Sequence, residues 1–94
     1  ESPIFAIENL EVNLGDSIIM GKNQDMIKLS HNGVSYLKFS DAEELIKLKN
    51  KNKTAVLNVV GRTGVNNYRG NVEPQFIIEA SEILEVKDTA RFVF

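Results

Sequence analysis

Hydrophobic and polar residues alternate along most of this chain, which is the pattern of β-strands that bury one face. The alternation breaks at short polar clusters rich in Asn, Asp and Gly, which are common turn residues. Asn32-Gly33 is the clearest of these and predicts a tight hairpin. The first predicted strand is Ile4–Val12, with a bulge at Glu8–Asn9, and it continues as Ser17–Met20 after a bend at Asn13–Asp16. Two further strands are predicted at Met26–Ser30 and Val34–Phe39.

A short helix is expected after these strands, because Ser40 and Glu43 are spaced as in a capping box. The helix should run to about Leu48 and bury Leu45 and Leu48. The lysine-rich segment Lys47–Lys53 is expected to be a solvated loop at its end. Alternation then predicts two more strands, Thr54–Val65 and Gln75–Glu79. The segment between them, Asn66–Glu73, is predicted to be a loop.

This order of elements predicts an all-β fold with one short helix. A helix between the third and fourth strands of a five-stranded Greek-key barrel is the arrangement of the oligonucleotide/oligosaccharide-binding fold, the OB-fold. We assign residues 1–84 to this domain, and residues 85–94 to a tail that adds a strand or begins the next element. Because the chain starts at Glu1-Ser2-Pro3, without Met or a basic leader, we interpret it as a fragment of a longer protein.

The composition fits a small folded domain from a reducing compartment. Hydrophobic residues make up 43% and charged residues 26% of the 94 residues, so a packed core is expected. The absence of Cys excludes disulfides and thiolate metal sites and fits a cytoplasmic location. No apolar run approaches the ~20 residues of a membrane span. The net charge of −2 means that any nucleic-acid contact needs a local cluster of cations.

The titratable residues do not form a catalytic or metal-binding set. His31 is the only histidine, and its place beside Asn32-Gly33 indicates a turn residue. With no Cys and this single His, the sequence offers neither a Cys–His pair nor a Ser–His–Asp triad for nucleophilic catalysis. Asp41 and Glu43 are explained by the helix start, where acidic side chains interact favourably with the macrodipole. We therefore expect no catalytic residue, bound metal or cofactor in this chain itself.

Ligand contacts are expected on one face of the predicted barrel. OB-folds bind ligands on the face of strands 2 and 3 and on the loops joining strands 1–2 and 4–5. Strand parity here predicts that Ile27, Leu29, Leu37 and Phe39 point inward. Their complement, expected to face the ligand, is Met26, Lys28, Tyr36 and Lys38. With the loops added, the candidate binding residues are Lys22, Lys28, Tyr36, Lys38, Arg62, Asn66, Tyr68, Arg69 and Gln75.

These side chains suit a single-stranded nucleic acid. Lysine and arginine neutralise phosphates and release counterions. Tyr36 and Tyr68 would stack on bases, at ~1–3 kcal/mol per base, and every base offers such a face. Asn66 and Gln75 would add hydrogen bonds to the backbone or to base edges. The expected binding is therefore electrostatic and stacking, without sequence readout.

Five of these residues, Lys28, Tyr36, Lys38, Arg62 and Tyr68, also have a simpler explanation. Outward lysines are often solvated strand residues, a strand tyrosine often shields the sheet surface, and Tyr68 could pack under its own loop. Arg62 could pair with Glu79 across neighbouring strands. The acidic balance and the apolar end Phe92–Phe94 favour a second function, docking against other protein domains without contact to DNA.

Several short motifs resemble the OB domain of RecJ-type exonucleases, which are specific for single-stranded DNA. The resemblance covers about residues 3–83 and includes Gly21-Lys22, the strand Met26–Leu29, the loop Asn66–Gly70, and Pro74-Gln75-Phe76. Met26 stands where the family often has His, and Tyr68 where it has Trp. By this resemblance, Lys22, Lys28, Arg62, Tyr68 and Arg69 would be binding residues.

The resemblance also implies what the longer protein does. It would be a metal-dependent exonuclease that degrades single-stranded DNA from the 5′ end during repair and recombination. Its Mn²⁺ or Mg²⁺ would be bound by aspartate–histidine motifs of the catalytic domains, and no such motif occurs in this chain. The expected partners of the present domain are therefore single-stranded DNA and the catalytic domains of the same chain, and no membrane.

Overall fold

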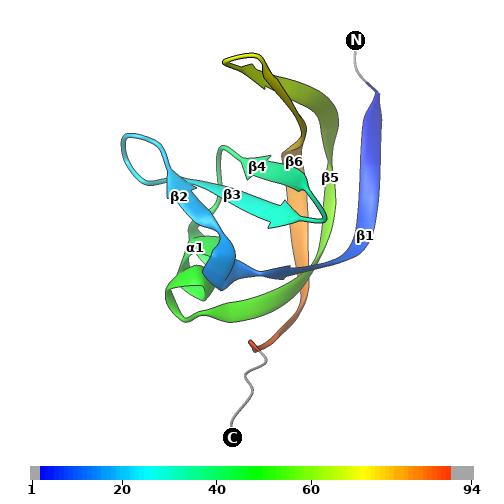
Figure 1. Cartoon of the computed structure of the whole chain (residues 1–94). Helices are drawn as coiled ribbons and strands as arrows, with labels where there is room; N and C mark the ends of the chain where they lie inside the picture. The colour runs from blue at the N-terminus through cyan, green and yellow to red at the C-terminus, as the bar shows by residue number, and fades with distance from the viewer. Residues whose placement is uncertain (1–2, 90–94) are drawn as a thin grey trace, which may run out of the picture.

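The computed structural model describes residues 3–89, except for the side chain of Tyr68. Six strands, one 3-10 helix and one α-helix make up this part of the chain (Figure 1). In chain order the elements are β1 (Ile4–Asn13), η1 (Leu14–Asp16), β2 (Ile18–Met20), β3 (Met26–His31), β4 (Val34–Lys38), α1 (Glu43–Asn50), β5 (Lys53–Tyr68) and β6 (Asn71–Asp88). No helix in residues 3–89 is long and apolar enough to cross a membrane.

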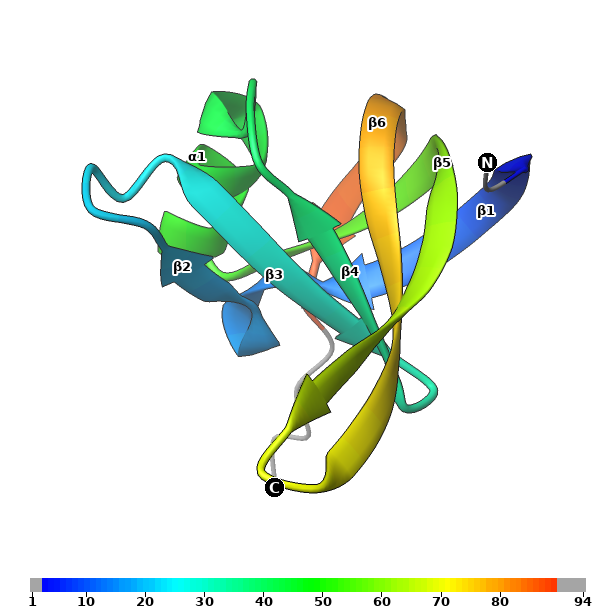
Figure 2. The ribbon, with the colours of Figure 1, turned by 90° about the horizontal axis from the view of Figure 1, so that it is seen from above.

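The strands form one sheet that has the topology of an OB barrel. Their order is β1-β5-β6-β4-β3-β2, and β4 and β6 run parallel while the other pairs are antiparallel. β1 pairs with β5 at one side of the sheet and β2 pairs with β3 at the other, with only η1 between β1 and β2 (Figure 2). β1 and β2 together therefore take the place of the first OB strand, and the predicted fold is confirmed.

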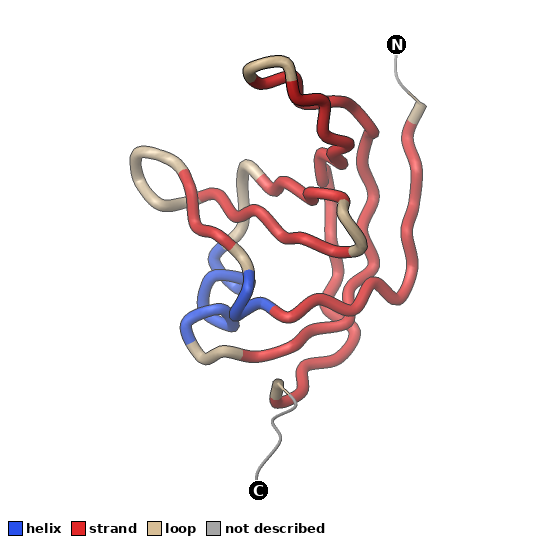
Figure 3. The backbone as a smooth tube through the Cα atoms, viewed as in Figure 1, coloured by secondary structure: helices blue, strands red, loops and turns tan. Residues whose placement is uncertain are grey.

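The core lies inside this curved sheet and is closed at one end by the helices. Figure 3 shows η1 and α1 together at that end, where Lys49 Nζ donates to the Gly15 carbonyl oxygen at 3.3 Å. Leu14 of η1 and Leu45 of α1 are both buried there. The other buried apolar residues come from the strands and from the start of α1, and they are Leu10, Val12, Ile27, Leu29, Tyr36, Ala42, Ala55, Leu57, Val59, Phe76 and Ile78.

The helix exists as predicted, but its start differs. Ala42 is the N-cap residue and provides no side-chain hydrogen bond, so the capping box expected from Ser40 and Glu43 is wrong. The N-cap therefore lies two residues later than predicted, after Asp41, whose backbone is left-handed with φ 54°. Leu45 is buried and Leu48 is half-buried, so the predicted apolar side of the helix does face the core.

The predicted loop Asn66–Glu73 is the tip of a long hairpin. Asn66 pairs with Glu73, and β5 and β6 continue to a two-residue turn at Arg69-Gly70. Both turn residues have positive φ, 51° and 82°, as type I′ turns require. The expectation of a loop here was wrong because two residues suffice to reverse the chain. At the other end, β6 continues to Asp88, and the bulge predicted at Glu8–Asn9 is confirmed by a shift of register between Ile7 and Leu10.

Candidate nucleic-acid interface

A row of paired residues crosses the outer face of the sheet. It consists of Lys28 of β3, Leu37 of β4, Ile77 of β6, Arg62 of β5 and Ile4 of β1. Paired residues on neighbouring strands point to the same side of the sheet. With ~4.8 Å between strands, the backbones of Lys28 and Arg62 are at most roughly 14 Å apart. The row therefore places one cation on each side of the apolar pair Leu37 and Ile77, with Lys28 on β3 and Arg62 on β5.

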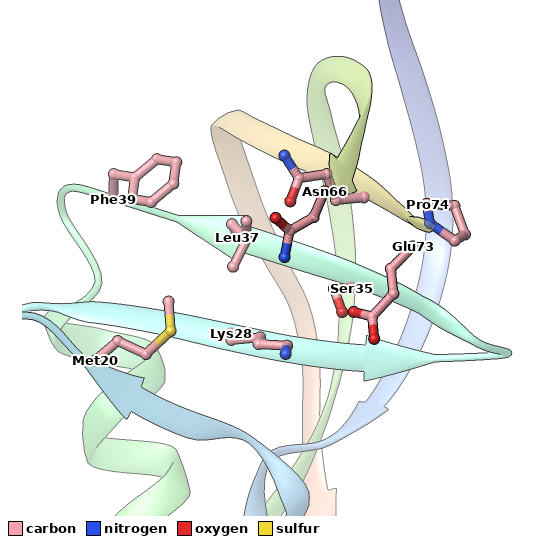
Figure 4. A pocket seen from close by; sticks show the side chains of 9 residues that line it. Met20, Lys28, Ser35, Leu37, Phe39, Asn66, Glu73 and Pro74 are labelled. Atoms are coloured by element: carbon pink, nitrogen blue, oxygen red, sulfur yellow. The ribbon is translucent and has the colours of Figure 1, made fainter. Parts of the chain in front are cut away.

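A groove of about 290 Å³ lies beside this row, between β3–β4 and the β5–β6 hairpin. Figure 4 shows Lys28 and Leu37 on neighbouring strands, with Asn66 and Glu73 reaching toward them from the hairpin. The groove is open and combines polar and apolar surface. Its lining residues are Met20, Lys28, Ser35, Leu37, Phe39, Asn66, Glu73, Pro74 and Gln75.

Three of the predicted binding residues, Lys28, Asn66 and Gln75, line this groove. Gln75 lies directly beside Ser35, its partner in the parallel β4–β6 pair. Lys28 is half-buried and is paired in register with Leu37. The structure thus brings Lys28 of β3, Asn66 of β5 and Gln75 of β6 to one groove, together with residues of β4 that the sequence analysis did not place there.

Tyr36 and Lys38 do not lie on this face, and their predicted orientation was wrong. Tyr36 is 6% and Lys38 is 7% exposed, whereas Phe39, predicted to be inward, is 48% exposed. The Tyr36 ring packs against Phe76 with 5.5 Å between ring centroids. This burial raises the pKa of the Tyr36 hydroxyl, because the charged phenolate loses its hydration there. Leu37 and Phe39 take the outward places.

The turn at Asn32-Gly33 explains this reversal. Its two residues have φ 49° and 80°, so His31 pairs directly with Val34. Two residues further along each strand, Leu29 must pair with Tyr36 and share its face. The Asn32-Gly33 turn therefore predicts the correct orientation of the β4 side chains. The hydrophobicity of Leu37 and Phe39 favoured the opposite orientation, which is wrong.

Arg62 faces outward as predicted, but it is already engaged. Its Nε donates to Oε2 of Glu79 at 2.7 Å, which is the cross-strand pair given above as the alternative. Both side chains are partly exposed, at 35% and 44%. An ion pair of this kind is worth about 0–1 kcal/mol, because water and salt screen it. This ion pair therefore adds little to the stability of the domain.

The remaining predicted residues lie in the two connecting segments. Lys22 is exposed in the turn between β2 and β3. Arg69 is exposed in the turn at the end of the hairpin, and Tyr68 is the last residue of β5, paired in register with Asn71. Neither Lys22 nor Arg69 lines the groove, and the side chain of Tyr68 lies outside the described part of the structure. The structure thus puts Lys22 and Arg69 in the segments that correspond to the OB ligand loops.

Sequence reasoning missed several lining residues. Met20, Ser35 and Pro74 come from positions with no distinctive chemistry, and only the register brings them to the groove. Glu73 matters most, because its carboxylate lies in the same groove as the Lys28 ammonium. The groove itself therefore has no net positive charge, and attraction of an anionic strand depends on Arg62, Lys22 and Arg69 around it.

Comparison with known proteins agrees with this geometry. The model of the RecJ OB domain family matches residues 1–80. The chain belongs to the RecJ OB domain family. The resemblance seen in the sequence motifs is thereby confirmed, and the barrel described above is the RecJ OB domain.

Two relatives of this RecJ OB domain are 34% identical to it over 89 residues. One, from Bacillus subtilis strain 168, is provisionally named an SPbeta prophage-derived single-strand DNA-specific exonuclease, YorK. The other, from Bacillus phage SPbeta, is provisionally named a single-strand DNA-specific exonuclease, yorK. The aligned region covers 93% of this chain and 16% of each relative. The chain thus spans about one sixth of the length of the relatives it matches.

Proposed function

We propose that this RecJ OB domain binds single-stranded DNA in the groove between β3–β4 and the β5–β6 hairpin. The observation that carries the proposal is the row in which Lys28 and Arg62 flank Leu37 and Ile77. Cations at both ends suit phosphates, and the apolar surface between them suits the faces of bases. Such a surface holds a strand without reading its sequence.

Phe39 takes the stacking role first given to Tyr36. Its ring is about half exposed and lines the groove next to Leu37 and Met20. Stacking on an aromatic ring contributes ~1–3 kcal/mol per base. Asn66 and Gln75 on the opposite wall carry amide groups that both donate and accept hydrogen bonds.

On this proposal the domain holds the substrate of a RecJ-like exonuclease that degrades single strands from the 5′ end in DNA repair and recombination in the cytoplasm. The relatives named as single-strand DNA-specific exonucleases support this assignment. The Mn²⁺ or Mg²⁺ of such an enzyme would be held by its catalytic domains, which would also be neighbours of this domain.

A titration of the ¹⁵N-labelled chain with oligo-dT at low salt tests the proposal. We expect amide shifts at Lys28, Leu37, Phe39, Asn66 and Gln75, and none in the core strand segment around Leu57. With two or three phosphates neutralised, log K should fall against log salt with a slope of roughly −1.4 to −2. Absence of shifts at low salt would favour the alternative, a domain that docks only against protein, and a flat salt dependence would contradict phosphate binding.

A further inference from the structure

β6 has a free edge over more than half of its length. β4 pairs with it only through Ser35–Lys38, opposite Gln75–Ile78. From Glu79 to Asp88, β6 pairs with β5 on one side, and no strand in residues 3–89 pairs with its other side. A free edge presents unpaired N–H and C=O groups, and it can therefore accept another strand.

A cleft of about 730 Å³ runs along this edge, between β6 and the first turn of α1. Its walls are formed by Leu45, Lys38 and acidic residues on one side and by residues 79–83 on the other. The helix that closes the barrel end therefore leaves the edge of β6 uncovered here. Space beside an unpaired strand edge is what an extended peptide needs for strand addition.

Lys38 lies where the free edge begins, and its ammonium is a donor that water can reach. It pairs in register with Ile78, the last residue of β6 that β4 covers, and its side chain lines the cleft. Lys38 is 7% exposed, and within residues 3–89 its ammonium has no hydrogen bond or ion pair but is not shut off from water. A backbone carbonyl of an added strand would replace water as the acceptor for this ammonium.

The charge around the cleft determines which segment fits. Asp41, Glu43, Glu44, Glu79 and Glu82 line it against the single cation Lys38. Glu79 is paired with Arg62, and Glu82 accepts from Asn58 at 3.2 Å, so the other three carboxylates contribute most to the field. A second copy of this edge would bring glutamates against glutamates, which is unfavourable. Lysine or arginine side chains would instead be attracted.

We propose that the β6 edge from Ala80 to Val86 binds an extended, lysine- or arginine-bearing protein segment by strand addition in this cleft. The site is separate from the proposed DNA groove, because the two share no lining residue. Backbone hydrogen bonds to β6 and to the Lys38 ammonium provide the affinity. The carboxylates Asp41, Glu43 and Glu44 select basic side chains.

The test uses the full chain, ¹⁵N-labelled, and an octapeptide of alternating lysine and valine. Two further peptides serve as controls: the same sequence with N-methylated valine amides, and a glutamate–valine version. We expect the lysine–valine peptide to shift the amides of residues 79–86 and of Lys38. The N-methylated peptide should bind several-fold more weakly, since it keeps the charge but loses backbone donors, and the glutamate–valine peptide should not bind.

Two double variants test the contribution of charge. Glu43→Gln with Glu44→Gln should weaken the lysine–valine peptide several-fold. Asp16→Asn with Asp25→Asn, which removes the same charge at positions that line neither the cleft nor the groove, should leave its affinity unchanged. Lys38→Met keeps the apolar stem and should also weaken binding, with the fold checked by its amide spectrum. Equal binding of the methylated peptide, equal loss in both double variants, or absence of binding at low salt would each overturn the proposal.

Discussion

Arg62 and Glu79 form an ion pair across β5 and β6, with 2.7 Å between Nε and Oε2, on the face that carries the proposed DNA groove. On the proposed function, Glu79 competes with phosphate for Arg62. We predict that Glu79→Gln raises the affinity for oligo-dT by about 0.2–1 kcal/mol, the range for an exposed pair. It should also steepen the salt dependence by up to about 0.7, equivalent to one more phosphate contact on a single strand.

Glu82→Gln is the matched control for this change. It removes the same charge from the same strand, and its partner is Asn58 rather than a cation. The two affinities are measured by fluorescence anisotropy with labelled oligo-dT over a series of salt concentrations. An equal gain in both variants would mean that overall charge, rather than competition for Arg62, governs binding.

Phe39→Ala tests the stacking surface. The ring is about half exposed, so its removal should change the stability little, whereas oligo-dT affinity should fall by ~1–3 kcal/mol if a base stacks on it. Phe5→Ala is the control, because Phe5 is 45% exposed but does not line the groove. The same anisotropy assay gives both affinities, and a Phe39 variant that binds like the wild type would remove Phe39 from the site.

The order of elements could be predicted from the sequence because each signal is local. Alternation of hydrophobic and polar residues predicted the strands. The helix between the third and fourth barrel strands was predicted from the spacing of Ser40 and Glu43 and from its apolar residues, Leu45 and Leu48, which are three positions apart. The face of each residue on β4 required more than alternation, because Tyr36 and Leu37 are both able to fill a core. There the two-residue turn at Asn32-Gly33 decides, since it fixes which residues of β3 and β4 are partners.

The site was less predictable because it depends on register between distant strands. Glu79 and Leu84 are extra residues in β6, where the pairing with β5 shifts between Val60 and Gly61 and between Val56 and Leu57. Such bulges bend the strands and redirect the side chains that follow. No local pattern in the sequence showed them. The position of Glu73 follows instead from the two-residue turn at Arg69-Gly70, and the free edge of β6 follows from the short pairing with β4, and alternation alone reveals neither.

Gly61 and Gly64 provide a matched pair for testing the close approach of β5 and β6. A Cβ on Gly61 would overlap the carbonyl oxygen of Ile77 and lie 2.8 Å from Cε1 of Phe76. We predict that Gly61→Ala destabilises the domain by about 1–3 kcal/mol or more, as expected for overpacking. A Cβ on Gly64 would lie 3.8 Å from Gln75 Nε2, an ordinary contact.

Gly64→Ala should therefore leave the free energy of unfolding unchanged or raise it by about 0.4–1 kcal/mol, because alanine restricts the unfolded chain. Urea unfolding of both variants measures the difference. If the two substitutions had equal effects, the bulged geometry at Gly61 would be contradicted, since only that geometry distinguishes the two glycines.

The buried Tyr36 predicts how stability depends on pH in alkaline solution. Burial raises the folded-state pKa of Tyr36 above the usual tyrosine value of about 10, so the unfolded chain ionises first as the pH rises. The unfolded state then holds fewer protons than the folded state, and the free energy of unfolding falls with pH. The contribution of Tyr36 is fully present below pH 10 and is lost as the pH rises toward the folded-state pKa.

Tyr36→Phe keeps the ring against Phe76 and removes this titration. We expect the variant to lose less stability than the wild type between pH 9.5 and pH 11.5. Some loss should remain, because the hydrogen bond to Glu11 raises the pKa of the Lys87 ammonium, and this exposed pair is also lost at high pH. Urea unfolding across this range measures both chains. Parallel curves would contradict the burial of Tyr36, because an exposed tyrosine has the same pKa in both states and adds no pH dependence.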